Sequence, residues 1–205
     1  MRAKRHAMHG EHLRRALAQE AARLMAEHGI RDFLVAKRKA AERFGVVDGA
    51  AMLPKNSEIE SALAEYQRLF GGASHLQALH AQRHAALSAM RYLREFSPRL
   101  VGPVLSGTAT VHTEVQLHLF ADRVESVALK LLDAGIPHEV TEKRVKLNAE
   151  RVRPFPGVRF EMDAQPIEAT VFPTDGIRQA PVSPVDGRPM RRANTFEVEA
   201  LLQQP

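Results

Sequence analysis

The stretch from Glu114 to Phe120 alternates polar and apolar residues, which is the pattern of a β-strand with one buried and one open side. Glu114, Gln116 and His118 therefore share one side, because side chains on a strand alternate with a period of two. A later stretch, PIEATVF, has the same pattern and carries Glu168 on its polar side. If the two strands are neighbours in one sheet, we expect Glu168 to lie beside Glu114 and Gln116.

Carboxylates on adjacent strands are what a divalent-metal site for phosphoryl transfer requires. Mg²⁺ prefers carboxylate oxygens, and metal ions can bridge a triphosphate and the attacking hydroxyl. In such a site Glu114 and Glu168 would be the ligands of Mg²⁺ or Mn²⁺, with Gln116 as an auxiliary ligand. The alternative is an exposed sheet face whose polar residues have no special role, and spacing by itself favours this alternative.

The elements that hold these strands follow from the periodicity of apolar residues. Residues 1–97 predict four helices with apolar positions at helical spacing, two of them ending at Gly29 and Gly45. After Pro98 the pattern changes to strands, with one helix near residues 122–135 and turns expected at residues 154–157 and 164–165. We therefore expect an α+β protein: a helical segment, residues 1–97, packed on a small β-sheet in residues 98–205 with a Pro/Gly-rich tail.

Three sequence elements carry a resemblance to a known family: Gly102-Pro103 after a short apolar run, Glu114-Val115-Gln116 on the next strand, and Glu168 on a later one. Together they resemble the nucleotidyltransferase superfamily, whose pattern is Gly-Ser, an Asp-x-Asp pair and a third acid. Members transfer a nucleoside monophosphate from a nucleoside triphosphate to a hydroxyl. The core of the resemblance covers residues 98–173 and implies a small mixed β-sheet of nucleotidyltransferase type. The helical stretches before it are similar to those of bacterial proteins that carry such a domain.

The departures from the family pattern bear on activity. Pro103 replaces a serine and offers neither hydroxyl nor backbone N–H. Gln116 replaces a carboxylate and has no negative charge. The resemblance implies that Gly102 and the Ser106-Gly107 turn approach the phosphates of a nucleotide and that His118 borders the site. We therefore expect a divergent nucleotidyltransferase-like protein that binds nucleotide and divalent metal, with nucleotidyl transfer weak or lost and an acceptor that the sequence does not name.

Composition and charge leave two other function classes open. The chain has 205 residues and no cysteine, which excludes disulfides and thiolate chemistry and favours a cytoplasmic location; no apolar run predicts a membrane span. Residues 1–50 hold 11 basic against 6 acidic residues, whereas the remainder holds 18 of each. The excess of basic residues in 1–50 is typical of a surface that binds nucleic acid. One interpretation is therefore a helix-turn-helix DNA-binding regulator that uses these N-terminal helices. A catalytically silent protein-interaction domain is the third interpretation.

The C-terminal tail contains four arginines that could meet a triphosphate. Arg178, Arg188, Arg191 and Arg192 follow the last predicted strand in a stretch rich in Pro and Gly. If this stretch folds back, its guanidinium groups reach the acidic face of the sheet. The alternative is a loosely wrapped tail, which the composition favours.

Overall fold

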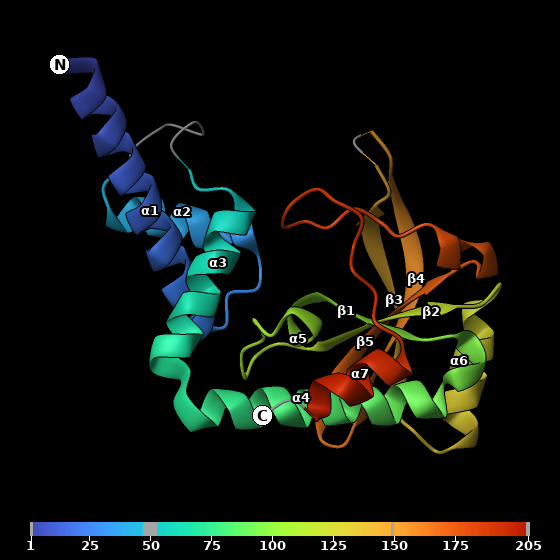
Figure 1. The fold of residues 1–205 in the computed structure, drawn as a ribbon. Helices are drawn as coiled ribbons and strands as arrows, with labels where there is room; N and C mark the ends of the chain where they lie inside the picture. Colours follow the sequence, from blue (N-terminus) through green and yellow to red (C-terminus); the bar gives the residue numbers. More distant parts are fainter. Residues whose placement is uncertain (1, 47–52, 149, 204–205) are drawn as a thin grey trace. The chain divides into compact units, whose positions relative to one another are not determined.

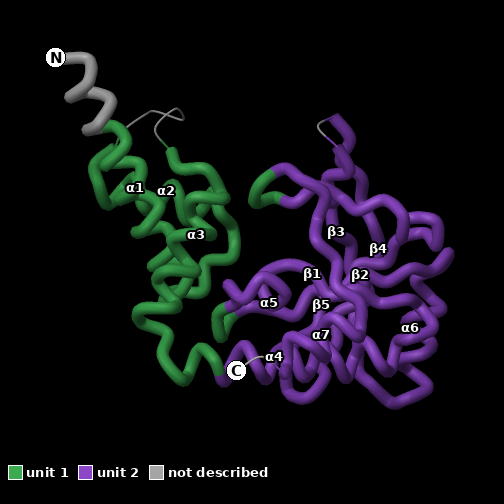
Figure 2. Tube along the Cα trace, viewed as in Figure 1, with its two compact units in different colours: residues 1–76, 110–112, 184–186 green, residues 77–109, 113–183, 187–205 purple. Residues whose placement is uncertain are grey.

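The structure is a computed structural model that describes residues 2–46, 53–148 and 150–203, with side chains described from residue 10 onward. It is an α+β protein, as the sequence predicts (Figure 1). The chain divides into two compact units (Figure 2). The first contains residues 1–76, 110–112 and 184–186, and the second contains residues 77–109, 113–183 and 187–205.

The first unit consists of helices packed through small side chains. They are α1 (Arg2–His28), α2 (Phe33–Arg43) and α3 (Asn56–Tyr66), which continues as a π-helical turn, η2 (Gln67–Gly71). Ala36 and Ala40 of α2 are fully buried in the same apolar cluster as Ile59 of α3. Alanine at these positions lets the helices approach closely, because it has no side chain beyond Cβ.

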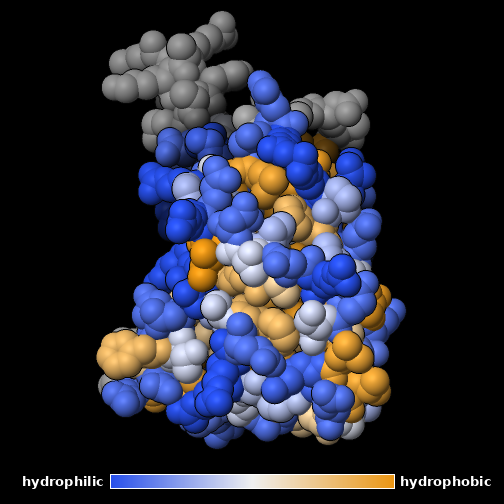
Figure 3. Space-filling model, turned by 90° about the vertical axis from the view of Figure 1, so that its right-hand side faces the viewer, coloured by the Kyte–Doolittle hydropathy of each residue, from blue (hydrophilic) through white to orange (hydrophobic). Residues whose placement is uncertain are grey.

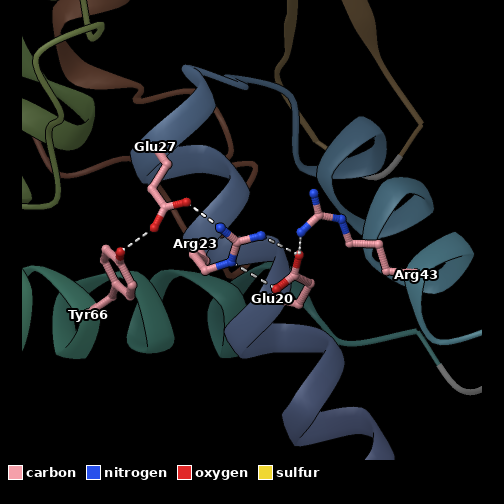
Figure 4. A network of polar contacts seen from close by, with 5 residues as sticks. All are labelled: Glu20, Arg23, Glu27, Arg43 and Tyr66. Carbon is pink, nitrogen blue, oxygen red and sulfur yellow. Dashed lines mark hydrogen bonds and ion pairs between the residues drawn. The ribbon is translucent and has the colours of Figure 1, made fainter.

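A polar network also connects the three helices of the first unit (Figure 4). Glu20 of α1 accepts hydrogen bonds from Arg23, at 2.9 and 3.0 Å, and from Arg43 of α2, at 2.6 Å. Glu27 accepts from the hydroxyl of Tyr66 on α3 at 2.6 Å and forms an ion pair with Arg23. Hydrogen bonding lowers the pKa of both carboxyls, through Arg23 at Glu20 and through Tyr66 at Glu27. These contacts hold α2 and α3 to α1.

The second unit is built on a mixed five-stranded sheet. Its strand order is β1-β2-β5-β4-β3, with β2 and β5 parallel and the other neighbours antiparallel. The strands are β1 (Arg99–Val101), β2 (Val115–Phe120), β3 (His138–Lys146), β4 (Val152–Met162) and β5 (Gln165–Phe172). The helices are α4 (Gly72–Tyr92), which begins in the first unit, η3 (Arg94–Phe96), α5 (Gly102–Ser106), α6 (Val124–Asp133), η4 (Thr174–Arg178) and α7 (Thr195–Leu202).

One face of the sheet forms the core of the second unit. Leu117 of β2, Ile167 of β5 and Val158 of β4 are fully or almost fully buried on this face. They belong to one apolar cluster with Met90 of α4 and Leu131 of α6, and Val198 of α7 completes it. Because the side chains of a strand alternate, the polar residues of β2 and β5 point to the opposite face, which we call the open face.

The structure corrects two details of the expected chain path. Residues 154–157 do not form a turn, because Pro154 and Pro156 lie within β4, opposite Arg144 and Glu142 of β3. The prolines are tolerated there since β5 pairs only with residues 157–162, so they interrupt no ladder with β5. The turn near Ala164 is confirmed, with positive φ at residues 163 and 164.

The expected boundary at residue 97 marks where helices give way to strands, but the compact units divide near residue 76. The reason is α4, whose buried face contributes Leu87, Ala89 and Met90 to the cluster under the sheet. The helix therefore belongs mostly with the strands that follow it.

The outer surface of α6 carries exposed apolar side chains. Leu129 and Leu132 are 57% and 63% exposed. Figure 3 views the molecule from this side and shows apolar patches among hydrophilic side chains. In the described part of the chain, no helix has both the length and the apolar composition that crossing a bilayer requires.

Candidate functional site

The parallel pairing of β2 and β5 brings the predicted site residues onto the open face. Gln116 is the register partner of Glu168, and His118 is the register partner of Thr170. Glu114 lies just before β2, two residues from Gln116, and so shares its face. From standard strand spacings, the Cα atoms of Glu114 and Glu168 are about 8 Å apart. Their side chains are long enough to approach the same point above the sheet.

Each of the two carboxylates is paired with a cation of the same sheet. Nη2 of Arg159 donates to both carboxylate oxygens of Glu114, at 3.1 and 3.2 Å. Arg159 belongs to β4 and is the register partner of Glu168 on β5. Its side chain therefore crosses over β5 to reach Glu114, a span of about 10 Å between strand axes. The guanidinium lies on the side of Glu114 that faces β5.

The second ion pair joins Glu168 to Lys143 of β3. The side chains of Glu168 and Lys143 are 22% and 38% exposed, so the pair is partly buried and solvent still reaches it. Ion pairs that solvent reaches contribute on the order of 1 kcal/mol to stability, so a competing ligand can displace Lys143 at small cost.

Gly102 lies directly against Gln116. Its φ is +72°, and a Cβ atom added to it would lie 2.6 Å from Oε1 of Gln116. A glycine here allows both the left-handed backbone conformation that opens α5 and the close approach of the amide side chain. The amide of Gln116 therefore packs between Gly102 on one side and Glu168 on the other strand.

The far end of the open face is covered by the C-terminal tail. Arg192 donates from Nε to Nδ1 of His118 at 3.0 Å and from Nη1 to the carbonyls of Gly176 and Ile177 at 3.0 and 3.3 Å. Its guanidinium also stacks over Phe120 and Phe172, at 5.0 and 5.3 Å from the ring centres. The tail thus folds back as one sequence interpretation suggested, but Arg192 binds a histidine and carbonyls instead of a carboxylate.

This contact sets the protonation state of His118. The side chain is only 5% exposed, and burial, together with the charges of Arg192 and Lys143, lowers its pKa to about 3. Because Arg192 is a donor only, Nδ1 of His118 must be the acceptor and the ring is neutral. Burial and the nearby Arg99 also lower the pKa of Arg192, to about 10. His118 is therefore a buried acceptor under the tail, on the same face as the partly buried carboxylates of Glu114 and Glu168.

Ser106 and Gly107 lie away from the open face. Gly107 ends α5 with a φ of +85°, and its nearest neighbours are side chains of Arg83 and Leu79 on α4. The hydroxyl of Ser106 bonds to that of Thr108 at 2.9 Å. Gly102 is at the opposite end of the same short helix, so the turn expected to approach phosphates is not brought beside Gln116.

The donor atoms of the open face suit one hard cation. Glu114 and Glu168 offer carboxylate oxygens and Gln116 offers an amide oxygen, the ligand types that Mg²⁺ prefers. Among the residues that the structure describes, no cluster of three or more His, Asp or Glu side chains is arranged to hold a metal. The three side chains could hold at most one ion, and phosphate or water would have to supply its remaining ligands.

Sequence reasoning missed Arg159 and Lys143, the two cations at the centre of the open face. The alternation of side chains along each strand indicates which face Arg159 and Lys143 occupy. Their position relative to Glu168, however, depends on the register between β3 and β4, which the hairpin turn sets. The misplaced turn at residues 154–157 concealed this register. A reading that allowed proline inside β4 would have aligned Arg159 with Glu168.

A hollow of about 330 Å³ lies on the first unit, remote in sequence from these strands. Exposed Phe44, Leu69 and Phe70 line it together with Arg23 and Tyr66 of the polar network. It has no cluster of acids suited to metal chemistry, but its apolar wall could receive a partner side chain.

Comparison with known protein families, curated proteins and solved structures finds no match to this chain.

Proposed function

We propose that the open face binds a nucleoside triphosphate together with one divalent cation, and that nucleotidyl transfer is weak or lost. The observation that supports this proposal is the arrangement of two carboxylates and two cations side by side: Glu114 with Arg159, and Glu168 with Lys143. The face has both the oxygen ligands for a hard metal ion and the donors for phosphate. The resemblance to nucleotidyltransferases supplies the class of ligand.

Binding would proceed by an exchange of partners. Glu114 and Glu168 would turn from the two side-chain cations to Mg²⁺ or Mn²⁺, with the amide oxygen of Gln116 as a further ligand. Arg159 and Lys143 would then donate to phosphate oxygens, for which Arg in particular has a matching planar fork. The bound ion would neutralise part of the negative charge of the triphosphate. Each of the four charged side chains would have a partner of opposite charge both before and after the exchange, so neither end state leaves a charge unpaired.

The same residues explain why catalysis should be poor. Gln116 offers no charge where the family has its second aspartate, and among the described residues no group of three or more His, Asp or Glu side chains could hold a metal ion. Two-metal transfer depends on ions at both the attacking and the leaving oxygen. A displacement of reacting groups by about 1 Å already costs on the order of 100-fold in rate. We therefore expect binding without efficient turnover.

The proposal is tested by calorimetric titration of each nucleoside triphosphate in the presence of Mn²⁺ or Mg²⁺. Wild-type protein should bind at least one of them, and Glu114→Ala and Glu168→Ala should each weaken binding by about 10-fold or more, in the range known for altered metal sites. Glu142→Ala is the matched control, since it removes an exposed carboxylate from the other face of β3. It should leave the affinity unchanged.

The result that overturns the proposal is the absence of binding for all four nucleotides, or equal effects of the site and control variants. In that case the silent interaction domain replaces it. The observation that favours this second function is the exposure of Phe44, Leu69 and Phe70 around the hollow of the first unit. Three large apolar side chains at one exposed hollow are more typical of a docking surface than of a solvated helix.

A further inference from the structure

The hairpin of β3 and β4 extends beyond the rest of the sheet. β5 pairs with residues 157–162 of β4, whereas β3 pairs with residues 152–160. The segment formed by residues 142–146 and 152–156 is therefore a two-stranded ribbon with no third strand beside it (Figure 1). The C-terminal tail meets its β3 edge at one point, where the N–H of Val182 donates to the carbonyl of Lys146 at 2.8 Å. Pro154 and Pro156 lie where β5 has ended and prevent another strand from adding there.

This ribbon carries a high positive charge. Residues 142–153 contain five basic residues and two acidic residues. Four of the basic side chains are exposed and have no ion-pair partner in the described parts of the chain; we call them the hairpin cations, and they are Arg144, Lys146, Arg151 and Arg153. Unpaired cations at this density favour a polyanionic partner.

The hairpin cations lie on both faces of the ribbon. Arg153 is on the same face as Lys143, because its register partner is Val145. Arg144 and Lys146 are on the opposite face, and Arg151 precedes β4 at the end of the ribbon. A flat anionic surface, such as a membrane, would meet only one of these faces. A groove with phosphates on both walls would meet both.

We propose that this ribbon binds double-helical DNA, with its two strands in the major groove and the hairpin cations on the flanking phosphates. The major groove of B-DNA is about 12 Å wide and admits a two-stranded β-ribbon. The major groove of duplex RNA is too narrow and deep for this. Single strands are bound by stacking on exposed aromatics, but the aromatic residue of the ribbon, Phe155, packs on Phe172 with ring centres 4.7 Å apart.

The inference does not depend on the proposed nucleotide site. The hairpin cations are different residues from Arg159 and Lys143. DNA binding is also measured in the absence of nucleotide. It also differs from the helix-turn-helix interpretation, which places the contact in the basic residues 1–50. Exposed Arg38 and Lys39 of α2 would then face the DNA.

The test is fluorescence anisotropy of the full chain with a labelled 20-base-pair DNA duplex across about 50 to 200 mM salt. Four phosphate contacts predict a slope of log K against log salt of about −3.6, so affinity should fall about 150-fold over this range. Replacing all four hairpin cations by Gln should flatten the slope to near zero. Arg153→Gln alone should reduce the slope by about 1. Circular dichroism verifies that the variants fold, since all four positions are exposed.

The control variant makes the same change of net charge on the first unit. It replaces four exposed cations there by Gln, namely Arg15, Arg38, Lys39 and Arg68. It should bind DNA as wild type does. The proposal is overturned if wild-type protein fails to bind the duplex at 50 mM salt, or if the control variant loses binding and the hairpin variant does not. Equal or tighter binding of duplex RNA or single-stranded DNA would also overturn it.

Discussion

Burial of His118 should make the second unit lose stability as the pH falls below neutrality. In the folded chain the pKa of His118 is lowered to about 3 by burial and by Arg192 and Lys143. In the unfolded chain it returns to about 6.5. Between these values the unfolded chain binds a proton that the folded chain does not, so stability is present above about pH 6.5 and decreases as the pH falls towards 3.

The size of the effect follows from the difference between the two pKa values. At pH 5 the unfolded histidine is almost fully protonated and the folded one is neutral. With about 1.4 kcal/mol for each pKa unit, the loss between pH 7 and pH 5 is about 2 kcal/mol. Below pH 3 the loss approaches about 5 kcal/mol, which is a large share of the stability of a typical domain.

The assay is urea unfolding followed by circular dichroism at pH 7, 6 and 5, for wild type and His118→Gln. The amide oxygen of Gln can accept the hydrogen bond from Nε of Arg192 but does not titrate. The variant should therefore lose about 2 kcal/mol less than wild type between pH 7 and pH 5. His84→Gln, an exposed position on α4, is the matched control and should keep the wild-type difference. Equal pH dependence of wild type and His118→Gln would refute the buried neutral histidine.

Two substitutions test other contacts of the open face. Arg159→Ala frees the carboxylate of Glu114 from its ion pair, so Mn²⁺ alone should bind to the variant several-fold more tightly than to wild type. Electron paramagnetic resonance of Mn²⁺ measures this affinity. Weaker binding to the variant would mean that the guanidinium of Arg159 does not compete with the ion. Gly102→Ala places a side chain at a φ of +72°, which costs about 1–2 kcal/mol of unfolding free energy. Gly187→Ala introduces a side chain at a similar φ of +74° with nothing within 4 Å. It should cost about the same free energy of unfolding, because at Gly102 the end of the Gln116 side chain can move away from the added methyl group. Only Gly102→Ala should also weaken nucleotide binding, and equal nucleotide affinity for both variants would argue against a role for Gln116.

Alternation and helical periodicity are local signals, and the features that depend on them were predictable. The α+β class and the shared face of Glu114, Gln116 and His118 follow from such patterns. These predictions needed no knowledge of distant contacts.

What the sequence could not supply depends on register and on long side chains. Arg159 reaches Glu114 across an intervening strand, and no local pattern encodes such a span. Arg192 is 74 residues from His118, and its position depends on the bridge between Leu100 and Ala193. Proline is a common turn residue, so Pro154 and Pro156 predicted a turn. They fit inside β4 because β5 has already ended and no ladder with β5 needs their backbone N–H groups. Each miss is a tertiary arrangement that overrides a local preference.

The most direct test of the open face is the linkage between metal and nucleotide. The affinity of the wild-type chain for a nucleoside triphosphate is measured with Mn²⁺ at saturation and again with the metal removed by EDTA. If Glu114 and Glu168 must leave Arg159 and Lys143 before phosphate can bind, the metal should tighten binding by at least about 10-fold, equivalent to about 1.4 kcal/mol of coupling. The same affinity with and without Mn²⁺ would contradict the exchange of partners.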